Sequence, residues 1–230
     1  MTKLTLGISL IASILVSSSS FSQTALNVHA GLNLSTMSIS DNDQSFNDGL
    51  STLAGYQFGT TIEFSLGNLI SLETGFKLAT RGYNYYELRT DSFGSAVWTT
   101  ETNADLKALY IDLPVRMNFN IGIGENSSLK IGVGPYAAFG IQASEHILQV
   151  TTNAHETTTD SDENADAFMY RNKLDYGLTA KVGFKYKSIL VQANYDFGLR
   201  NMEWNPSNGF KALHRVFGIS LGYQFGLGKK

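Results

Sequence analysis

The chain of 230 residues contains no cysteine, three prolines and few charged residues, which make up 16% of its length. Without cysteine it can form neither a disulfide framework nor a zinc–thiolate site, and no lipid can be attached through a thiol. The formal net charge of −3 gives no electrostatic reason to expect nucleic acid as a partner. After residue 22 no apolar run reaches the roughly 18 residues of a helical membrane span.

Glycine and aromatic residues are abundant instead: the chain has 22 Gly, 14 Phe and 11 Tyr. Aromatic side chains fit pleated, half-buried surfaces, and Gly marks bulges and places where backbones approach closely. Helix-favouring runs rich in Ala, Leu, Glu and Lys are absent. This composition favours an all-β protein of about one domain.

The first 22 residues have a different character from the rest. Lys3 supplies a positive charge, residues 4–16 form an apolar core, and Ser20-Phe21-Ser22 is a small-x-small cleavage pattern before Gln23. The apolar run is about 13 residues, too short to cross a bilayer as a helix. We therefore expect a signal peptide at residues 1–22 and one domain over residues 23–230.

Past Gln23 apolar and polar residues alternate with period 2 in eight segments. Each is at least as long as the roughly 9–11 residues that a tilted membrane strand needs. The segments are residues 26–34, 54–66, 70–81, 109–121, 129–142, 174–186, 189–200 and 217–225. They predict an eight-stranded antiparallel up-and-down transmembrane β-barrel.

The connections between these segments alternate in length, as in outer-membrane barrels, which have short periplasmic turns and long external loops. Short turns fall at 67–68, 122–127 and 187–188; long polar links fall at 35–50, 88–103, 145–167 and 201–211. An even number of strands then places both termini on the periplasmic side. The strands around the second long link continue toward residues 83–86 and 97–98, so this hairpin could stand above the membrane.

A soluble lipocalin-like barrel is the alternative, because period 2 also fits a barrel whose apolar face lines a ligand cavity. Three observations favour the membrane. Gly crowds the polar face, as a narrow lumen filled with long polar side chains requires, and aromatics lie near the segment ends of the apolar face, where interfacial girdles form. The last segment also matches the polar-x-Gly-x-x-aromatic-x-hydrophobic signal of the barrel-assembly machinery, at Ser220, Gly222, Phe225 and Leu227, although Lys229 and Lys230 extend beyond it.

Several stretches carry a resemblance to a known family: LYIDLPVRMNF at 109–119, KIGVGPY at 130–136, YGL at 176–178 with GF at 183–184, and YDFGL at 195–199. They resemble the porin-family or PorT-like outer-membrane β-barrel proteins abundant in Bacteroidota, over essentially the whole mature chain. The motifs are diffuse, because they largely restate strand alternation. The resemblance implies an integral protein of a Gram-negative outer membrane, and some relatives are tied to secretion machinery.

The assignment of faces points five acids and seven bases into the lumen, an excess of two positive charges. They are Glu63, Glu73, Asp112, Asp175 and Asp196 with Lys77, Arg81, Arg116, Lys130, Lys181, Lys185 and Arg200. Eight strands enclose a space barely wide enough for their own side chains, and unpaired buried charges are very costly. We therefore expect a salt-bridged plug.

A three-residue turn at Gly67 would place Glu63 opposite Glu73, so these carboxylates need a base between them. Arg116, Lys130, Lys181 and Lys185 are the candidates. The alternative to a structural plug is a gate whose bridges rearrange to pass ions. The gate hypothesis predicts a single-channel conductance that changes when Glu73 is replaced by Ala.

No catalytic residue, cofactor or metal site emerges from the sequence, and we expect the chain not to be an enzyme. His29 and His214 would face the lumen, but no Ser-His-Asp order, HExxH or Cys-His pair is present, and a nucleophile needs a base within reach. The stretch 160–166 mimics half of a calcium loop, yet Ala165 replaces the required Gly and Arg171 the required acid. An acidic solvated loop is the simpler interpretation.

Two functions from different classes therefore remain. One is a structural or interaction barrel with a plugged lumen that presents four external loops. The other is a narrow porin-like channel or an accessory of secretion. Either would have outer-membrane lipid and lipopolysaccharide and the barrel-assembly machinery as partners, with a protein partner at the loops in the first case. A packed charge network in the lumen favours the first function, and a continuous water path favours the second.

Overall fold

The computed structural model describes residues 24–42, 44–45, 47–94, 96–154, 156–164, 167–169, 171–203 and 208–227. No helix among them is long and apolar enough to cross a membrane. The expected signal peptide at residues 1–22 lies outside the described residues.

The described residues form ten strands and one short helix. The elements are β1 (Thr24–Ser40), β2 (Leu50–Ser51), β3 (Leu53–Ser65), β4 (Ile70–Phe93), β5 (Ala96–Gly122), β6 (Ser127–Asn153), β7 (Thr157–Asn164), η1 (Ala167–Met169), β8 (Leu174–Tyr186), β9 (Ile189–Gly198) and β10 (Lys211–Gly226).

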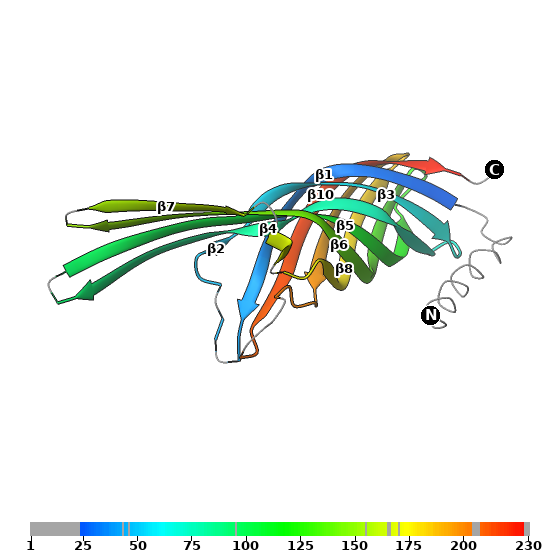
Figure 1. The fold of residues 1–230 in the computed structure, drawn as a ribbon. Helices are drawn as coiled ribbons and strands as arrows, with labels where there is room; N and C mark the ends of the chain where they lie inside the picture. The colour runs from blue at the N-terminus through cyan, green and yellow to red at the C-terminus, as the bar shows by residue number, and fades with distance from the viewer. Residues whose placement is uncertain are drawn as a thin grey trace.

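Eight of these strands close into a ring (Figure 1). Each pairs antiparallel with both of its neighbours in the order β1, β3, β4, β5, β6, β8, β9, β10 and back to β1. The closing pair, β1 with β10, runs from Ala25 opposite Gly226 to Ser40 opposite Lys211. Closure leaves the barrel without a free sheet edge, and the predicted eight-stranded fold is confirmed.

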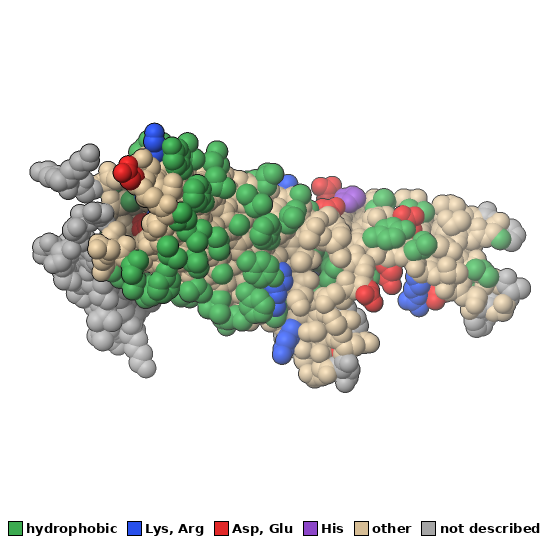
Figure 2. All heavy atoms as spheres, turned by 180° about the vertical axis from the view of Figure 1, so that it is seen from behind, with side chains coloured by type: hydrophobic (Ala, Val, Ile, Leu, Met, Phe, Trp, Pro, Cys, Tyr) green, Lys and Arg blue, Asp and Glu red, His purple; other side chains and the backbone are tan. Residues whose placement is uncertain are grey.

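The apolar face of the barrel points outward. Leu32, Phe76 and Leu221 expose 73%, 60% and 62% of their surface, whereas Arg81 on the polar face exposes 0%. On the face that Figure 2 shows, the outward side chains form a broad apolar belt across the barrel. A lipocalin-like barrel would have these faces reversed, so the structure excludes that alternative.

The two ends of the barrel differ as the sequence predicts. Short turns join β3 to β4, β5 to β6 and β8 to β9, and β1 begins and β10 ends at this same end (Figure 1). In the first turn Leu66 N donates to Ile70 O, which leaves three residues in the turn and sets Glu63 opposite Glu73. The longer connections all lie at the opposite end, called the loop end below.

Three barrel strands continue past the loop end as a sheet that projects from the barrel (Figure 1). β4 pairs with β5 as far as Phe93 opposite Ala96, β5 pairs with β6 as far as Trp98 opposite Asn153, and β7 pairs with the outer part of β6. We call this sheet, residues 84–107 and 144–164, the paddle. The predicted hairpin extension is confirmed.

The prediction of a loop at 145–167, in contrast, is wrong for most of its length. Residues 145–153 continue β6, and Thr157–Asn164 form β7, so the acidic stretch that resembled a calcium loop lies within a strand as far as Asn164. The sequence did not predict this strand because β7 is exposed on both faces. Because no side of β7 is buried, its Thr, Asp and Glu residues show no apolar alternation from which a strand could be predicted.

A bulge in β6 changes which residues face the lumen. Leu109 pairs with Gln142 but Tyr110 pairs with Gly140, so Ile141 is the extra residue. Two neighbours on a bulged strand then oppose one partner residue, and the alternation shifts by one position. Gln142, which strict alternation points inward, is exposed, and Ala143 is buried in its place.

Candidate functional site: a filled lumen

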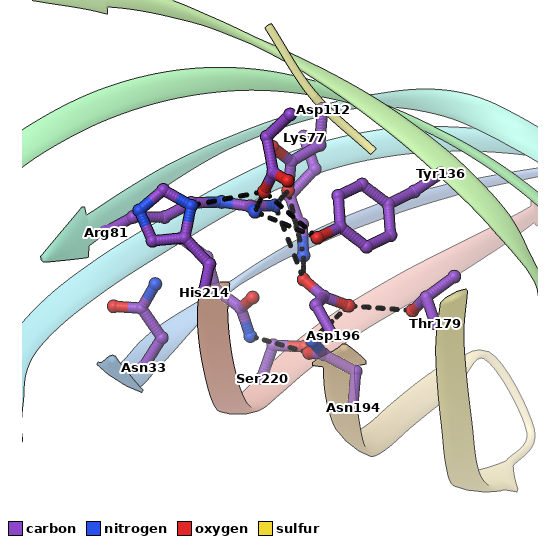
Figure 3. A network of polar contacts seen from close by, with 12 residues as sticks. Asn33, Lys77, Arg81, Asp112, Tyr136, Thr179, Asn194, Asp196, His214 and Ser220 are labelled. Carbon is purple, nitrogen blue, oxygen red and sulfur yellow. Dashed lines mark hydrogen bonds and ion pairs between the residues drawn. The ribbon is translucent and has the colours of Figure 1, made fainter. Parts of the chain in front are cut away.

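A ring of polar side chains crosses the lumen, and each of the eight barrel strands supplies at least one of them (Figure 3). All are at least 94% buried. In strand order from β1 to β10 the ring contains Asn33, Gln57, Arg81 with Lys77, Asp112, Tyr136, Asp175 with Thr179, Asp196 with Asn194, and His214.

Arg81 lies at the centre of this ring. Its Nη1 donates to Asp175 Oδ2 at 2.5 Å, and its Nη2 donates to Asp112 Oδ2 at 2.9 Å. The guanidinium carbon also lies 5.2 Å and 4.9 Å from the ring centroids of Tyr110 and Tyr136, within the range of cation–π attraction. One cation thereby joins strands β4, β5, β6 and β8.

Lys77, four residues before Arg81 on β4, holds the next pair of carboxylates. Its Nζ is 2.6 Å from Asp196 Oδ2 and 3.2 Å from Asp112 Oδ2. Thr179 donates to the other oxygen of Asp196 at 2.7 Å. Asp196 therefore has donors on both oxygens, the condition under which a buried carboxylate is tolerated.

A second ionic layer lies nearer the short-turn end, around Glu63 and Glu73. Arg116 Nη2 donates to Glu73 Oε1 at 2.7 Å, and Lys181 donates to Glu73 Oε2. Lys130 Nζ donates to Glu63 Oε2 at 2.5 Å. The two opposed carboxylates thus bind separate bases and do not share one between them.

Two of the expected lumen bases do not join these layers. Lys185 is only partly buried and forms no ion pair among the described residues. Arg200 lies beyond the end of β9, where it donates to Asn172 and covers the outward-facing ring of Tyr176. Without them the layers hold five acids and five bases. Lys185 still lies near Lys130 and Glu63, whereas Arg200 has left the lumen, so the lumen excess is one positive charge and not the expected two.

An apolar cap covers the ionic layers at the loop end, and sequence reasoning missed it. Phe168 of the short η1 helix is buried beside Gly140 and meets Tyr110 edge-on, with ring centroids 5.7 Å apart. Met37, Leu106, Met202 and Ala212 complete the cluster. Gly140 is the one available signal, because a Cβ there would lie 2.1 Å from the Phe168 ring.

The segment after η1 is held to the paddle by a second arginine. Arg171 Nη2 donates to Glu145 Oε1 at 2.9 Å and to the Tyr83 hydroxyl at 3.3 Å. Burial lowers the pKa of Arg171, but Tyr83 and Glu145 outweigh it and raise this pKa above its usual value. Arg171 therefore keeps its charge and fastens the cap at any physiological pH.

These layers leave the lumen side chains almost no surface that a water molecule could touch. Glu73 exposes 1%, Lys77 5% and Asp175 0% of their surface. Two surface hollows, one at each end of the barrel, contain no member of either ionic layer. The arrangement is thus a packed charge network, which binds the strands to one another.

Comparison with known proteins agrees with this architecture. The family model of the outer membrane protein beta-barrel domain matches residues 18–203, which is most of the chain. The chain belongs to this family. It is an integral β-barrel protein of the Gram-negative outer membrane. A comparison with curated proteins found no match.

Solved outer-membrane structures similar to the barrel have low sequence identity. Ail, the attachment invasion locus protein of Yersinia pestis, is 12% identical, with 88% of this chain and 99% of that chain covered and a TM-score of 0.37. OprG of Pseudomonas aeruginosa is 14% identical, with coverages of 89% and 96% and a TM-score of 0.40. The outer membrane protease OmpT of Escherichia coli is 10% identical, with coverages of 90% and 98% and a TM-score of 0.36.

The residues of the expected assembly signal divide between the two faces of β10 and its end. Ser220 is buried and accepts from Gln192 Nε2 at 3.0 Å, and Gly222 packs against His29. Phe225 and Leu227 are exposed on the outside of the barrel. A recognition role for these four residues stays a prediction.

Proposed function

We propose that this outer-membrane barrel is a closed anchor that presents the paddle to a partner beyond the membrane. The proposal rests on one observation: strands β4, β5 and β6 pass from the barrel into the paddle without a break. Such a sheet stays ordered without a partner, so little conformational entropy is lost on binding. The filled lumen supports an anchoring role over transport.

The orientation that we propose has the paddle outside the cell and both termini in the periplasm. It is supported by the gathering of the three short turns and the described termini at one end of the barrel (Figure 1). Outer-membrane barrels place short turns in the periplasm and long connections outside.

The charge of the paddle suggests the chemistry of its partner. Acids outnumber bases there, with Arg89 and Lys107 as the bases; the acids are Glu87, Asp91, Glu101, Asp105, Glu145, Glu156, Asp160, Asp162 and Glu163. Arg89 is also paired with Asp91. We propose a partner that offers a basic surface, because complementary potentials speed encounter and suppress wrong partners.

Catalysis and solute transport are not part of this proposal. His214 is 98% buried and its Nδ1 lies 3.2 Å from Asp175, so it can neither reach a substrate nor activate a surface nucleophile. A narrow channel would need the paired charges of both ionic layers to separate. No residue that the structure describes in the lumen or the paddle supports a PorT-like role in secretion.

The absence of native cysteine allows the orientation to be tested by single-cysteine labelling. A membrane-impermeant maleimide should label Leu88→Cys in the paddle on intact cells. The matched variant Asn126→Cys, in a short turn, should be labelled only after the outer membrane is permeabilised. The reverse pattern would refute the proposed orientation.

The interaction role is tested by photo-crosslinking in growing cells. A photoreactive residue at Leu88 should give a protein adduct, and the same residue at Leu221 in the apolar belt should give none. The adduct should weaken when Asp160, Asp162 and Glu163 are replaced by Asn, Asn and Gln. An adduct that these substitutions leave unchanged argues against recognition through the acidic paddle.

A further inference from the structure

Strand β7 forms one margin of the paddle (Figure 1). It pairs along its whole length with β6, from Thr157 opposite Thr152 to Asn164 opposite Glu145, and no other strand of the described residues pairs with it. In an antiparallel sheet the N–H and C=O groups of successive residues point alternately to one neighbouring strand and to the other. Half of the backbone groups of β7 therefore point away from the paddle.

The turn between β6 and β7 shows which groups these are. Asn153 N donates to Glu156 O, so the turn closes on a hydrogen-bonded pair. Alternation from this pair directs the backbone groups of residues 158, 160 and 162 toward β6. The residues whose N–H and C=O point away from β6 are Thr157, Thr159, Ser161 and Glu163. They offer donors and acceptors to a further strand.

The usual protections of a free sheet edge are missing from β7. Proline, lysine, a bulge or a very short strand normally keeps an edge from pairing with another chain. β7 has eight residues, contains neither Pro nor Lys, and keeps an unbroken register with β6. The opposite margin of the paddle is partly covered, because Leu50 and Ser51 of β2 pair with β4. β7 is thus the margin that is open along its whole length.

The side chains of β7 select which strand can pair with it. Asp160 and Asp162 are exposed on one face of the paddle, and Thr159 and Ser161 are exposed on the other. Like charges directly opposite each other destabilise a pair of strands, whereas opposite charges stabilise it. Pairing with β7 of a second copy is therefore disfavoured. A strand with basic residues at alternate positions is favoured.

We propose that β7 binds an extended basic segment of another protein as an additional antiparallel strand of the paddle. Lys or Arg at alternate positions of this segment lie opposite Asp160 and Asp162, and hydroxyl residues between them lie opposite Thr159 and Ser161. Backbone hydrogen bonds supply affinity, and the alternate side chains supply specificity. The inference rests on the proposed function, since it names the part of the basic partner that the paddle meets.

The antiparallel direction follows from the register. The backbone groups of Asp160 and Asp162 face β6, so on the outer side these two residues form pairs without hydrogen bonds. Side chains of an antiparallel pair approach most closely at such positions, which suits ion pairs. The basic residues of the added strand then have their own N–H groups directed away from β7.

The first test measures how a fluorescent peptide binds the full-length barrel in detergent micelles, by anisotropy. The probe alternates Lys and Thr over the length of β7, and the reference peptide has the same composition with every Lys at one end. The alternating peptide should bind at least tenfold more tightly. Equal affinities would overturn the proposal, because general attraction between charges does not distinguish the two peptides.

Variants of the protein locate the binding surface. Asp160→Asn with Asp162→Asn should lose at least tenfold of the affinity for the alternating peptide. The matched control, Glu101→Gln with Asp105→Asn, removes two acids from the central strand β5 and should keep the affinity. Ser161→Pro removes an outward N–H and spares the hydrogen bonds to β6, so it should also lose at least tenfold. An equal loss in the control pair would overturn the edge as the site.

Methylated peptides test the pairing without altering the protein, so they do not depend on how any variant folds. Methyl groups on the Thr nitrogens, which face β7 in the proposed pairing, should abolish binding. Methyl groups on the Lys nitrogens, which face away, should leave it unchanged. Tolerance of both sets of methyl groups would overturn the added strand.

Failure of this inference is distinct from failure of the proposed function. The photo-crosslinked adduct at Leu88 should be lost in Ser161→Pro as well as in the acidic substitutions. An adduct that needs the acids but survives Ser161→Pro would place a basic partner on a face of the paddle. That result refutes the added strand and keeps the interaction role.

Discussion

Glu73 shows how single residues keep the barrel closed. Its two oxygens accept from Arg116, Lys181 and Asn118, which all project from β5 or β8, so one β4 side chain crosses the lumen to two other strands. A buried ion pair adds little net stability over apolar packing, but removing one partner leaves the other charge buried and unpaired. The network is therefore sensitive to the loss of any member.

Replacing Glu73 by Gln should destabilise the barrel by about 3–5 kcal/mol, because Arg116 and Lys181 lose their common carboxylate. Urea-dependent loss of the compact band on gels measures the effect. Asp162→Asn on the exposed β7 strand is the control and should leave the unfolding midpoint unchanged. An equal midpoint for both variants would show that the lumen charges do not hold the barrel.

The partners within the lumen could not be assigned from the sequence, although its polar face could. Alternation placed Arg81 and Asp175 inside, but their contact joins residues 94 positions apart and depends on how the ring closes. Arg200 was assigned by alternation to the lumen, yet β9 ends at Gly198 and the side chain turns outward over Tyr176. Where each strand ends and how the strands are staggered decide which lumen side chains meet and which way Arg200 points, and alternation gives neither.

At the scale of elements, η1 and the part of the paddle formed by β7 and the outer end of β6 are what strand alternation did not predict. η1 is three residues long and has no repeat, and β7 is exposed on both faces. The eight barrel strands, in contrast, were predictable because lipid outside and a packed lumen inside impose opposite chemistry on successive residues.

The cap can be tested by a double-mutant cycle between Gly140 and Phe168. Gly140→Ala should cost about 1–3 kcal/mol, because its Cβ would overlap the Phe168 ring. Phe168→Ala should cost about 3–5 kcal/mol through the cavity that it leaves. In the double variant the new methyl group enters that cavity, so the combined loss should be smaller than the sum. Additive losses measured by urea unfolding would place Phe168 away from Gly140.

Shortening the paddle should leave the barrel intact. Replacing residues 88–101 and 148–161 each by a two-residue Asn-Gly turn removes backbone pairs that lie only beyond the loop end, while both ionic layers and the cap stay complete. The shortened protein should keep the unfolding midpoint of the full chain within error. A marked loss would mean that the paddle and the barrel form one cooperative unit.

The whole molecule is a closed body, since the cap and two ionic layers fill the lumen from the loop end toward the short turns. Purified protein should therefore give no single-channel current in planar bilayers. Glu73→Ala should stay equally silent, because Lys181, Arg116 and the neighbouring layer still occupy the lumen. Steady currents from wild type that change with this substitution would support the gate instead.

The uninterrupted run of β4, β5 and β6 has a mechanical consequence. A partner that pulls on the tip of the paddle applies force along the strands, so the ladders of hydrogen bonds between them are loaded side by side in shear. Many bonds must then fail together, whereas a pull across a sheet edge would open them one at a time. A load on the tip of the paddle is thereby carried into the barrel wall.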